Sequence, residues 1–118
     1  MNIEELQRLC KALPHATEDI KWGNDLCFCI GEKMFCVIGL NQSPTSASFK
    51  VTDEEFEELS ARQGFQPAPY VARYKWVLVH DTNTLSAKEW QHYVTQSYTL
   101  VKAKLPAKVR KEIDGEKK

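Results

Sequence analysis

The chain contains 118 residues, with 16 basic and 16 acidic side chains and a formal charge of +0. That length suits one domain, and the hydrophobic share of 42% with the charged share of 27% excludes a disordered or collagen-like protein. No apolar run approaches the roughly 20 residues that a membrane-spanning helix needs, so we expect no contact with a membrane.

The first segment is predicted to be a helix. Asn2 and Glu5 have the spacing of a capping box, and apolar residues recur at helical spacing from Ile3 until Pro14 ends the pattern. The acids that follow Met1 differ from the basic and then apolar start of a signal peptide. We therefore expect a cytoplasmic protein whose four cysteines are reduced.

A β-hairpin is the clearest feature of the next segment. Polar and apolar residues alternate in a first short strand that ends near Trp22, and two further strands, residues 26–30 and 33–38, then flank Gly31 and Glu32. A two-residue loop with Gly first favours a type II′ turn. The sequence therefore predicts two antiparallel strands joined at Gly31.

Side-chain alternation in that hairpin predicts what each face carries. The register pairs Phe28 with Phe35 and Leu26 with Val37, and we assign these four residues to the core face. The opposite face then carries Cys27, Cys29, Met34, Cys36 and Ile38. We expect this partly apolar face to be covered, either by the last helix or by a second copy of the chain.

The rest of the chain alternates between strands and capped helices. A short strand at residues 47–51 leads into a helix capped by Thr52, while two prolines exclude a central strand at residues 65–70. Residues 74–80 are strongly strand-like. A capping box that begins at Ser86 opens the last helix, which Pro106 ends.

These elements predict a single α+β domain over residues 1–105. Its order is helix, three or four strands, helix, one or two strands, helix, which favours two layers with an antiparallel sheet packed on helices. Residues 106–118 are predicted to form a charged, mobile tail, since residues 102–118 hold seven basic and three acidic side chains.

An ordered series of short motifs resembles the MmcQ/YjbR family of small bacterial proteins. The similarity runs from about Ile3 to Leu105. The matching pieces are Leu13–Glu18, Lys21–Gly23, Cys27–Phe28, Gly31–Phe35, Phe49–Lys50, Pro67–Tyr70, Lys75–Val77 and Ser97–Tyr98. The resemblance implies a two-layer fold similar to secretion chaperones, and DNA binding through projecting hairpins called a double wing. It implies no catalytic residues.

Basic and aromatic residues interleave at three places in the chain. Cations that contact phosphates beside rings that stack on bases suit a nucleic-acid binder, although the same rings also suit a sheet core. The candidate DNA-binding residues are Lys21, Trp22, Lys33, Arg73, Lys75 and Trp76. The acidic helix over residues 53–58 would repel phosphate, so any DNA face should lie away from it.

The cysteines and histidines have weaker functional patterns. Cys27, Cys29 and Cys36 share a face in the predicted register, where they suit zinc, a reversible disulfide or simple packing. Their spacing is not that of a zinc knuckle, so we expect no metal or other cofactor. Without a Gly-rich phosphate loop, a serine elbow or paired carboxylates, we expect no enzyme. The alternative to DNA is a protein-interaction or chaperone-like module that uses an exposed sheet face or forms a homodimer.

Overall fold

The computed structural model describes residues 1–115 and has the predicted α+β architecture. Short 3-10 turns lie at Ala72–Tyr74 and Thr82–Thr84. The helices are α1 (Ile3–Lys11), α2 (Asp53–Ala61), α3 (Ala87–Ala103) and α4 (Ala107–Gly115). The strands are β1 (Thr17–Lys21), β2 (Asp25–Ile30), β3 (Lys33–Gly39), β4 (Ser46–Lys50), β5 (Phe65–Pro67) and β6 (Trp76–Val79).

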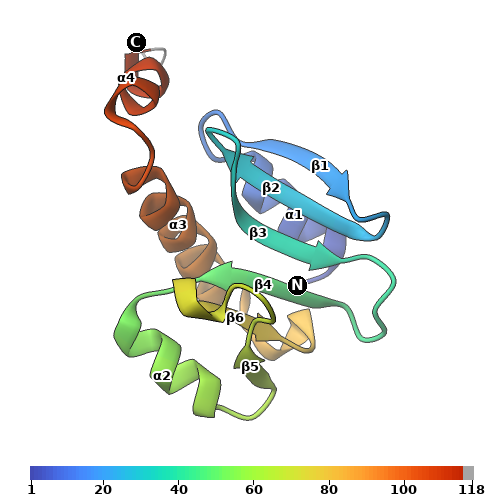
Figure 1. Cartoon of the computed structure of the whole chain (residues 1–118). Coiled ribbons are helices and arrows are strands. Elements are labelled where there is room, and N and C mark those ends of the chain that lie inside the picture. The colour runs from blue at the N-terminus through green and yellow to red at the C-terminus, as the bar shows by residue number, and fades with distance from the viewer. Residues whose placement is uncertain (116–118) are drawn as a thin grey trace.

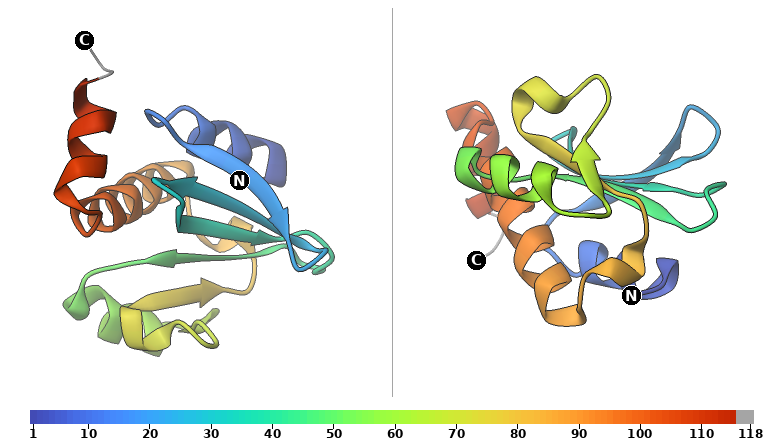
Figure 2. Two further views of the ribbon diagram at one scale, coloured as in Figure 1. Left: turned by 45° about the horizontal axis from the view of Figure 1, so that its top comes forward. Right: turned by 90° about the horizontal axis from the view of Figure 1, so that it is seen from below.

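The six strands form one antiparallel sheet in the order β1-β2-β3-β4-β6-β5 (Figure 1). Helices α1 and α3 cover one face of this sheet, and α2 packs beside strands β5 and β6. The right view of Figure 2 shows α1 and α3 beneath the sheet, while the loop between β5 and β6 rises above it. The fold therefore has a helix-covered face and an open face.

Each predicted helix start is confirmed. The side chains of Asn2, Thr52 and Ser86 each accept a hydrogen bond from the backbone N–H three residues later. The side chain of the glutamate at that later position accepts a hydrogen bond from the backbone N–H of the capping residue. These reciprocal bonds satisfy backbone groups that the first turn of a helix cannot pair. Local sequence thus fixes where α1, α2 and α3 begin.

The predicted hairpin turn at Gly31 is confirmed, but its type is not II′. Both turn residues have a positive φ, 55° for Gly31 and 69° for Glu32, which is the pattern of a type I′ turn. A Cβ on Gly31 would also lie 2.7 Å from Cδ1 of Leu105, which lies between α3 and α4, so the close approach of this side chain favours glycine here as well.

The predicted register holds only next to the turn. Ile30 pairs with Lys33 as expected, but Phe28 pairs with Cys36 instead of Phe35, because a bulge adds one residue to β3. Phe35 and Cys36 are consecutive, yet both belong to the core. A bulge produces this result by interrupting the alternation of side chains along a strand.

A buried serine of α3 satisfies the backbone beside the bulge. The Ser97 hydroxyl donates to the Phe35 carbonyl at 2.6 Å and accepts from the Lys50 N–H at 3.0 Å. These two groups lie just beyond Cys36 and Phe49, the last paired residues of β3 and β4 at this end. Ser97 therefore supplies the two bonds that the separated strands do not make to each other.

The shifted register corrects three predicted positions. Cys36 and Ile38 lie in the helix-covered core, where Cys36 contacts Cys10 of α1, and they are not on the open face. Val37, predicted to be in the core, pairs with Cys27 and lies on the open face. The predicted core positions of Leu26, Phe28 and Phe35 are confirmed.

The predicted mobile tail is largely a helix. Residues 107–115 form α4, Ile113 is buried, and Lys102 of α3 contacts Asp114 at 2.7 Å. Ile113 belongs to the core and Val109, partly buried, packs against it, which explains how a charged segment can dock. The last part of the predicted tail, residues 116–118, lies outside the described residues.

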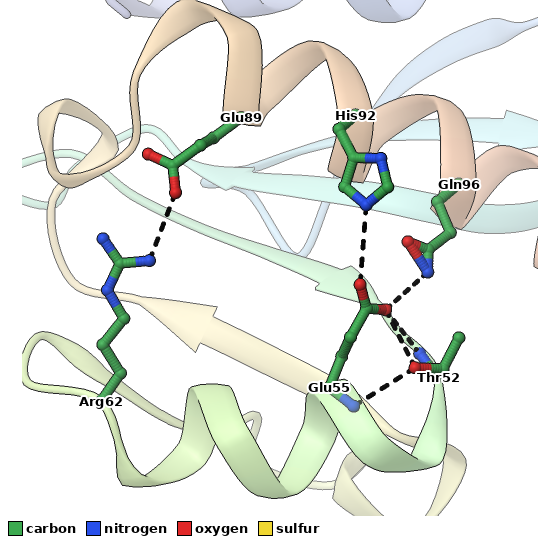
Figure 3. Close-up of polar contacts among 6 residues, drawn as sticks. All are labelled: Thr52, Glu55, Arg62, Glu89, His92 and Gln96. Atoms are coloured by element: carbon green, nitrogen blue, oxygen red, sulfur yellow. Dashed lines mark hydrogen bonds and ion pairs between the residues drawn. The ribbon is translucent and has the colours of Figure 1, made fainter.

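Polar contacts join α2 to α3 (Figure 3). The Glu55 carboxylate accepts from the Thr52 backbone and hydroxyl at 3.1 and 3.0 Å and from the Gln96 amide at 2.5 Å, and His92 lies 3.6 Å away. Arg62 and Glu89 form a second link at 3.4 Å. One carboxylate thus serves both the cap of α2 and its attachment to α3.

Candidate functional site: a groove on the open sheet face

The open face of the sheet carries a groove of about 940 Å³. It lies between the β1–β2 turn and the β3–β4 loop at one end and the β5–β6 loop at the other. Its lining is Trp22, Asp25, Met34, Val37, Gly39, Gln42, Ser43, Pro44, Ser46, Ser48, Gln66, Ala68, Pro69, Tyr70, Val71, Trp76, Leu78 and His80. This volume is typical of a site for a ligand.

Strand alternation explains the floor of the groove. Val37 pairs with Ser48 and Ser48 with Leu78, so one row of side chains crosses β3, β4 and β6 on the open face. Their neighbours in each strand, such as Phe49 and Val77, are fully buried on the helix side. The floor is therefore a mixture of apolar and hydroxyl groups set by the same register that builds the core.

Two exposed aromatic side chains form opposite rims of the groove. Trp22, in the β1–β2 turn, is 71% exposed, and Tyr70, in the β5–β6 loop, is 98% exposed. Both residues have left-handed backbones, with φ of 54° and 70°. Such conformations are costly for bulky residues and are concentrated at functional sites. Each rim therefore carries an exposed aromatic side chain on a strained backbone.

Hydrogen bonds hold both rims in place. The Ala68 N–H donates to Trp76 O at 3.0 Å, the Val51 N–H donates to Lys75 O at 2.8 Å, and the Lys50 ammonium donates to Tyr74 O. Lys50 is buried, and this burial holds its pKa below the ordinary value.

At the other end of the groove, the Leu40 N–H donates to Asn24 O at 2.8 Å and joins the β3–β4 loop to the β1–β2 turn. Anchored in this way, the rims form a preorganised site.

The groove is nearly uncharged. Asp25 is the one Asp, Glu, Lys or Arg side chain in the described lining, and the remaining polar groups are hydroxyls, amides and the His80 imidazole. Such a surface can hydrogen-bond and stack, but it offers no cation to a phosphate inside the groove.

The six predicted DNA-binding residues do not form one patch. Trp22 and Trp76 line the groove, but Trp76 is 6% exposed and belongs to its wall. Lys33 lies beside the β2–β3 turn, at the end of β2 away from Lys21 and the β1–β2 turn. Figure 1 shows these two turns at opposite ends of the strands.

The two remaining cations lie over rings outside the groove. The Arg73 guanidinium lies 4.8 Å from the Tyr74 ring centre, and the Lys75 ammonium lies 5.0 Å from that of Phe56 in α2. Lys75 therefore covers the acidic helix α2. Lys75 lies just before β6 and not in a strand, because its left-handed backbone, with φ of 66°, does not fit an extended strand.

Tyr70 lines the groove but is not among the six residues predicted from the sequence. Its position between Pro69 and Val71 resembles an ordinary exposed loop, and no periodicity distinguishes it. The two prolines before it are the available signal, since they exclude a central strand and favour a loop that can project a side chain.

The cysteines lie on both faces of the sheet. Cys27 and Cys29 are buried on the open side of β2, and burial raises the pKa of Cys27 to about 11 and also raises that of Cys29. The pKa of Cys10 is raised by its hydrogen bond to Cys36 and by burial. These three thiols stay protonated near neutral pH, which makes them weak nucleophiles. Within residues 1–115, no group of three or more His, Cys, Asp or Glu is placed to hold a metal ion.

Comparisons with known proteins agree with this fold. The crystal structure of a Deinococcus radiodurans protein with a DUF419 domain has a TM-score of 0.85 and 28% identity to this chain, covering 96% of it and 88% of the relative. A Pseudomonas syringae structure has a TM-score of 0.69 and 21% identity, over 85% of this chain and 98% of that one, and it supports the fold alone.

The lengths of the helices bear on membranes, and two sequence comparisons bear on family. None of the helices in residues 1–115 is long and apolar enough to cross a membrane. No curated protein matches the chain. The YjbR family model matches residues 11–100, and the chain therefore belongs to the YjbR family.

Proposed function

We propose that the protein is a protein-interaction module that binds an extended segment of a partner in the groove on its open sheet face. The main support is the pair of exposed aromatic rims, Trp22 and Tyr70, at strained backbone positions on either side of an almost uncharged groove. Aromatic residues that are solvated in the free protein and covered on binding are typical anchors of protein interfaces.

The shape of the site favours an extended ligand. The groove runs across several strands, and its floor alternates apolar Val37 and Leu78 with the hydroxyl of Ser48. An extended peptide offers both side chains for apolar contacts and backbone groups for hydrogen bonds to such a floor. Membership of the YjbR family names no ligand, so the chemistry of the groove carries the proposal.

Selection from a phage-displayed library of random peptides tests this function. Peptides should be enriched on the full-length protein and should lose binding to a Trp22→Asn, Tyr70→Asn double variant, because asparagine tolerates the left-handed backbone but removes the rings. The control is Ile20→Asn, which removes a 57% exposed apolar side chain from the helix-covered side of β1. A library that yields no peptide sensitive to the double variant contradicts the proposal.

DNA binding is the second candidate, and the positions of two cations favour it. Lys21 precedes the Trp22 rim, and Arg73 follows the Tyr70 rim, so a single strand could stack bases on the rims while its phosphates pass these cations. The β1–β2 turn and the β3–β4 loop, which lie side by side, then act as the projecting hairpins of a double wing.

Mobility shifts with single-stranded DNA at about 50 mM salt separate the two candidates, since phosphate contacts are strong there. If DNA follows the groove, Lys21→Glu and Arg73→Glu should weaken binding, whereas Lys33→Glu, at the far end of β2, should have little effect. Absence of a shift, or equal effects of all three variants, contradicts DNA binding along the groove.

A further inference from the structure

We infer that the partner segment is a polyproline II stretch with a lysine or arginine beside its prolines. This inference rests on the proposed function, because it names the chemistry of the ligand for the same groove. It follows from three properties of the lining: the number and placement of its rings, the kind of hydrogen-bonding groups it offers, and its single carboxylate.

The rings of the lining suit proline. Trp22 and Tyr70 stand at opposite rims and Trp76 lies in the wall, so the groove is divided by aromatic surfaces. Aromatic-lined grooves bind proline-rich segments because the flat pyrrolidine ring packs against them and the polyproline II helix is already ordered. Little conformational entropy is then lost on binding.

The polar groups of the lining suit a backbone without N–H donors. Ser46, Ser48, Gln42 and Gln66 carry hydroxyl and amide donors. A polyproline II segment has carbonyls that are not bonded within the segment, and proline adds no N–H that would need an acceptor. The donors of the groove therefore match the acceptors of such a segment.

The charge of the lining predicts the residue beside the prolines. Asp25 is the one carboxylate in the described lining, and it opens β2 just after the turn that carries Trp22. A lysine or arginine next to the prolines would pair with it at this rim. A nucleic-acid backbone would instead bring phosphates toward Asp25, and no Lys or Arg among the described lining residues offsets that repulsion.

The geometry disfavours the other common modes of peptide binding. Addition of a strand needs an open sheet edge, whereas this groove lies on the sheet face with Val37 and Leu78 standing between the backbone ladder and the ligand. A helical ligand needs a continuous apolar groove for its stripe, but here hydroxyls and amides interrupt the floor.

Fluorescence anisotropy with labelled synthetic peptides tests the inference on the full-length protein. The probe is an oligoproline peptide that ends in arginine, with matched peptides in which alanine replaces proline or glutamate replaces arginine. The arginine peptide should bind more tightly than both. Trp22→Asn or Tyr70→Asn should weaken its binding by about ten-fold or more, while Ile20→Asn should leave it unchanged.

Asp25→Asn should reduce the preference for arginine over glutamate without abolishing binding of the prolines. The matched control is Glu4→Gln, which removes an exposed acid from α1 on the helix-covered side. Retention of the full preference by Asp25→Asn contradicts the assignment of the basic residue.

The possible outcomes distinguish a failure of this inference from a failure of the proposed function. If alanine and proline peptides bind equally, or if library selection yields peptides without proline that depend on Trp22 and Tyr70, the inference is wrong and the interaction module stands. If no peptide binds through the rims and single-stranded DNA does, both are overturned. Self-association that the Trp22 and Tyr70 variants abolish would identify a second copy as the occupant and would also overturn the inference.

Discussion

The two faces of the sheet are built from the same strands but differ in almost every physical property. The helix-covered face holds the fully buried rings of Phe28, Phe35 and Phe49. Phe35 packs edge-on against Tyr98 of α3, and Phe49 packs against Trp90 of the same helix. The open face holds hydroxyls, amides and the exposed rings of Trp22 and Tyr70. Residues that alternate along one strand therefore divide into a stabilising set and a set that is free to bind.

The comparison also shows where backbone strain is tolerated. Left-handed non-glycine residues occur at the two rims and in turns, whereas the core strands interrupt their regular pairing only at the β3 bulge, where Ser97 restores the lost hydrogen bonds. The lost pairing at the bulge is therefore compensated within the core, whereas the strain at the two exposed rings costs free energy that no burial of these rings offsets. The following predictions test this division.

The largest effect should come from truncating the core ring of α3. Trp90 is fully buried, its indole N–H donates to Thr82 O at 2.7 Å, and its ring packs edge-on against Phe49. We expect Trp90→Ala to lower the free energy of unfolding by about 3–5 kcal/mol in urea titrations. A loss below about 1 kcal/mol would mean that the helix-covered face is not the main source of stability.

Removal of the hydroxyl beside the bulge should have the next largest effect. Ser97→Ala leaves the Phe35 carbonyl and the Lys50 N–H buried and unpaired, which we expect to cost about 2–4 kcal/mol in the same titration. Thr99→Ala, on the exposed side of the same helix, is the control and should change stability by less than about 0.5 kcal/mol. Equal effects of the two variants would contradict the bridging role of Ser97.

The link between α2 and α3 should contribute less. Glu55→Ala removes both the capping partner of Thr52 and the contact with Gln96, and we expect it to cost about 1–2 kcal/mol. Glu57→Ala removes an exposed acid from the same helix without these contacts and serves as the control. Thermal unfolding followed by circular dichroism measures both variants, and a Glu57 effect as large as that of Glu55 would refute the assignment.

Relief of strain at the rims should act in the opposite direction. Trp22→Gly and Tyr70→Gly remove exposed rings from left-handed positions, so we expect stability to be unchanged or to rise by up to about 1 kcal/mol. Ile20→Gly, in the extended backbone of β1, should instead cost about 1 kcal/mol. Clear destabilisation by either rim variant would show that the rings serve the fold.

The smallest effect should be a contribution to acid sensitivity. The Ser86 backbone N–H, with a smaller contribution from Arg62, holds the pKa of Glu89 below its ordinary value. A lowered pKa in the folded state stabilises the protein above the ordinary value, and this stability is lost as pH falls through the lowered value. Glu89→Gln should therefore flatten the dependence of unfolding free energy on pH below about pH 4. An unchanged slope would contradict this contribution.

Local signals in the sequence predicted most of the secondary structure. The capping boxes at Asn2, Thr52 and Ser86 mark helix starts because the interacting atoms lie three residues apart, and Gly31 marks the hairpin turn because few residues adopt its conformation. The α+β class and the family resemblance depend on the same short-range patterns, and both are confirmed.

Only the tertiary structure decided which residues share a face and which reach the groove. The bulge at Phe35 depends on the fit of β3 against α3, including Ser97, which lies 62 residues away in the sequence, so alternation alone placed Cys36 and Val37 on the wrong sides. Tyr70 reaches the groove because bonds from Lys50 and Val51 position its loop over the sheet. Short-range patterns carry no information on such contacts, because their energy arises only when distant segments pack together.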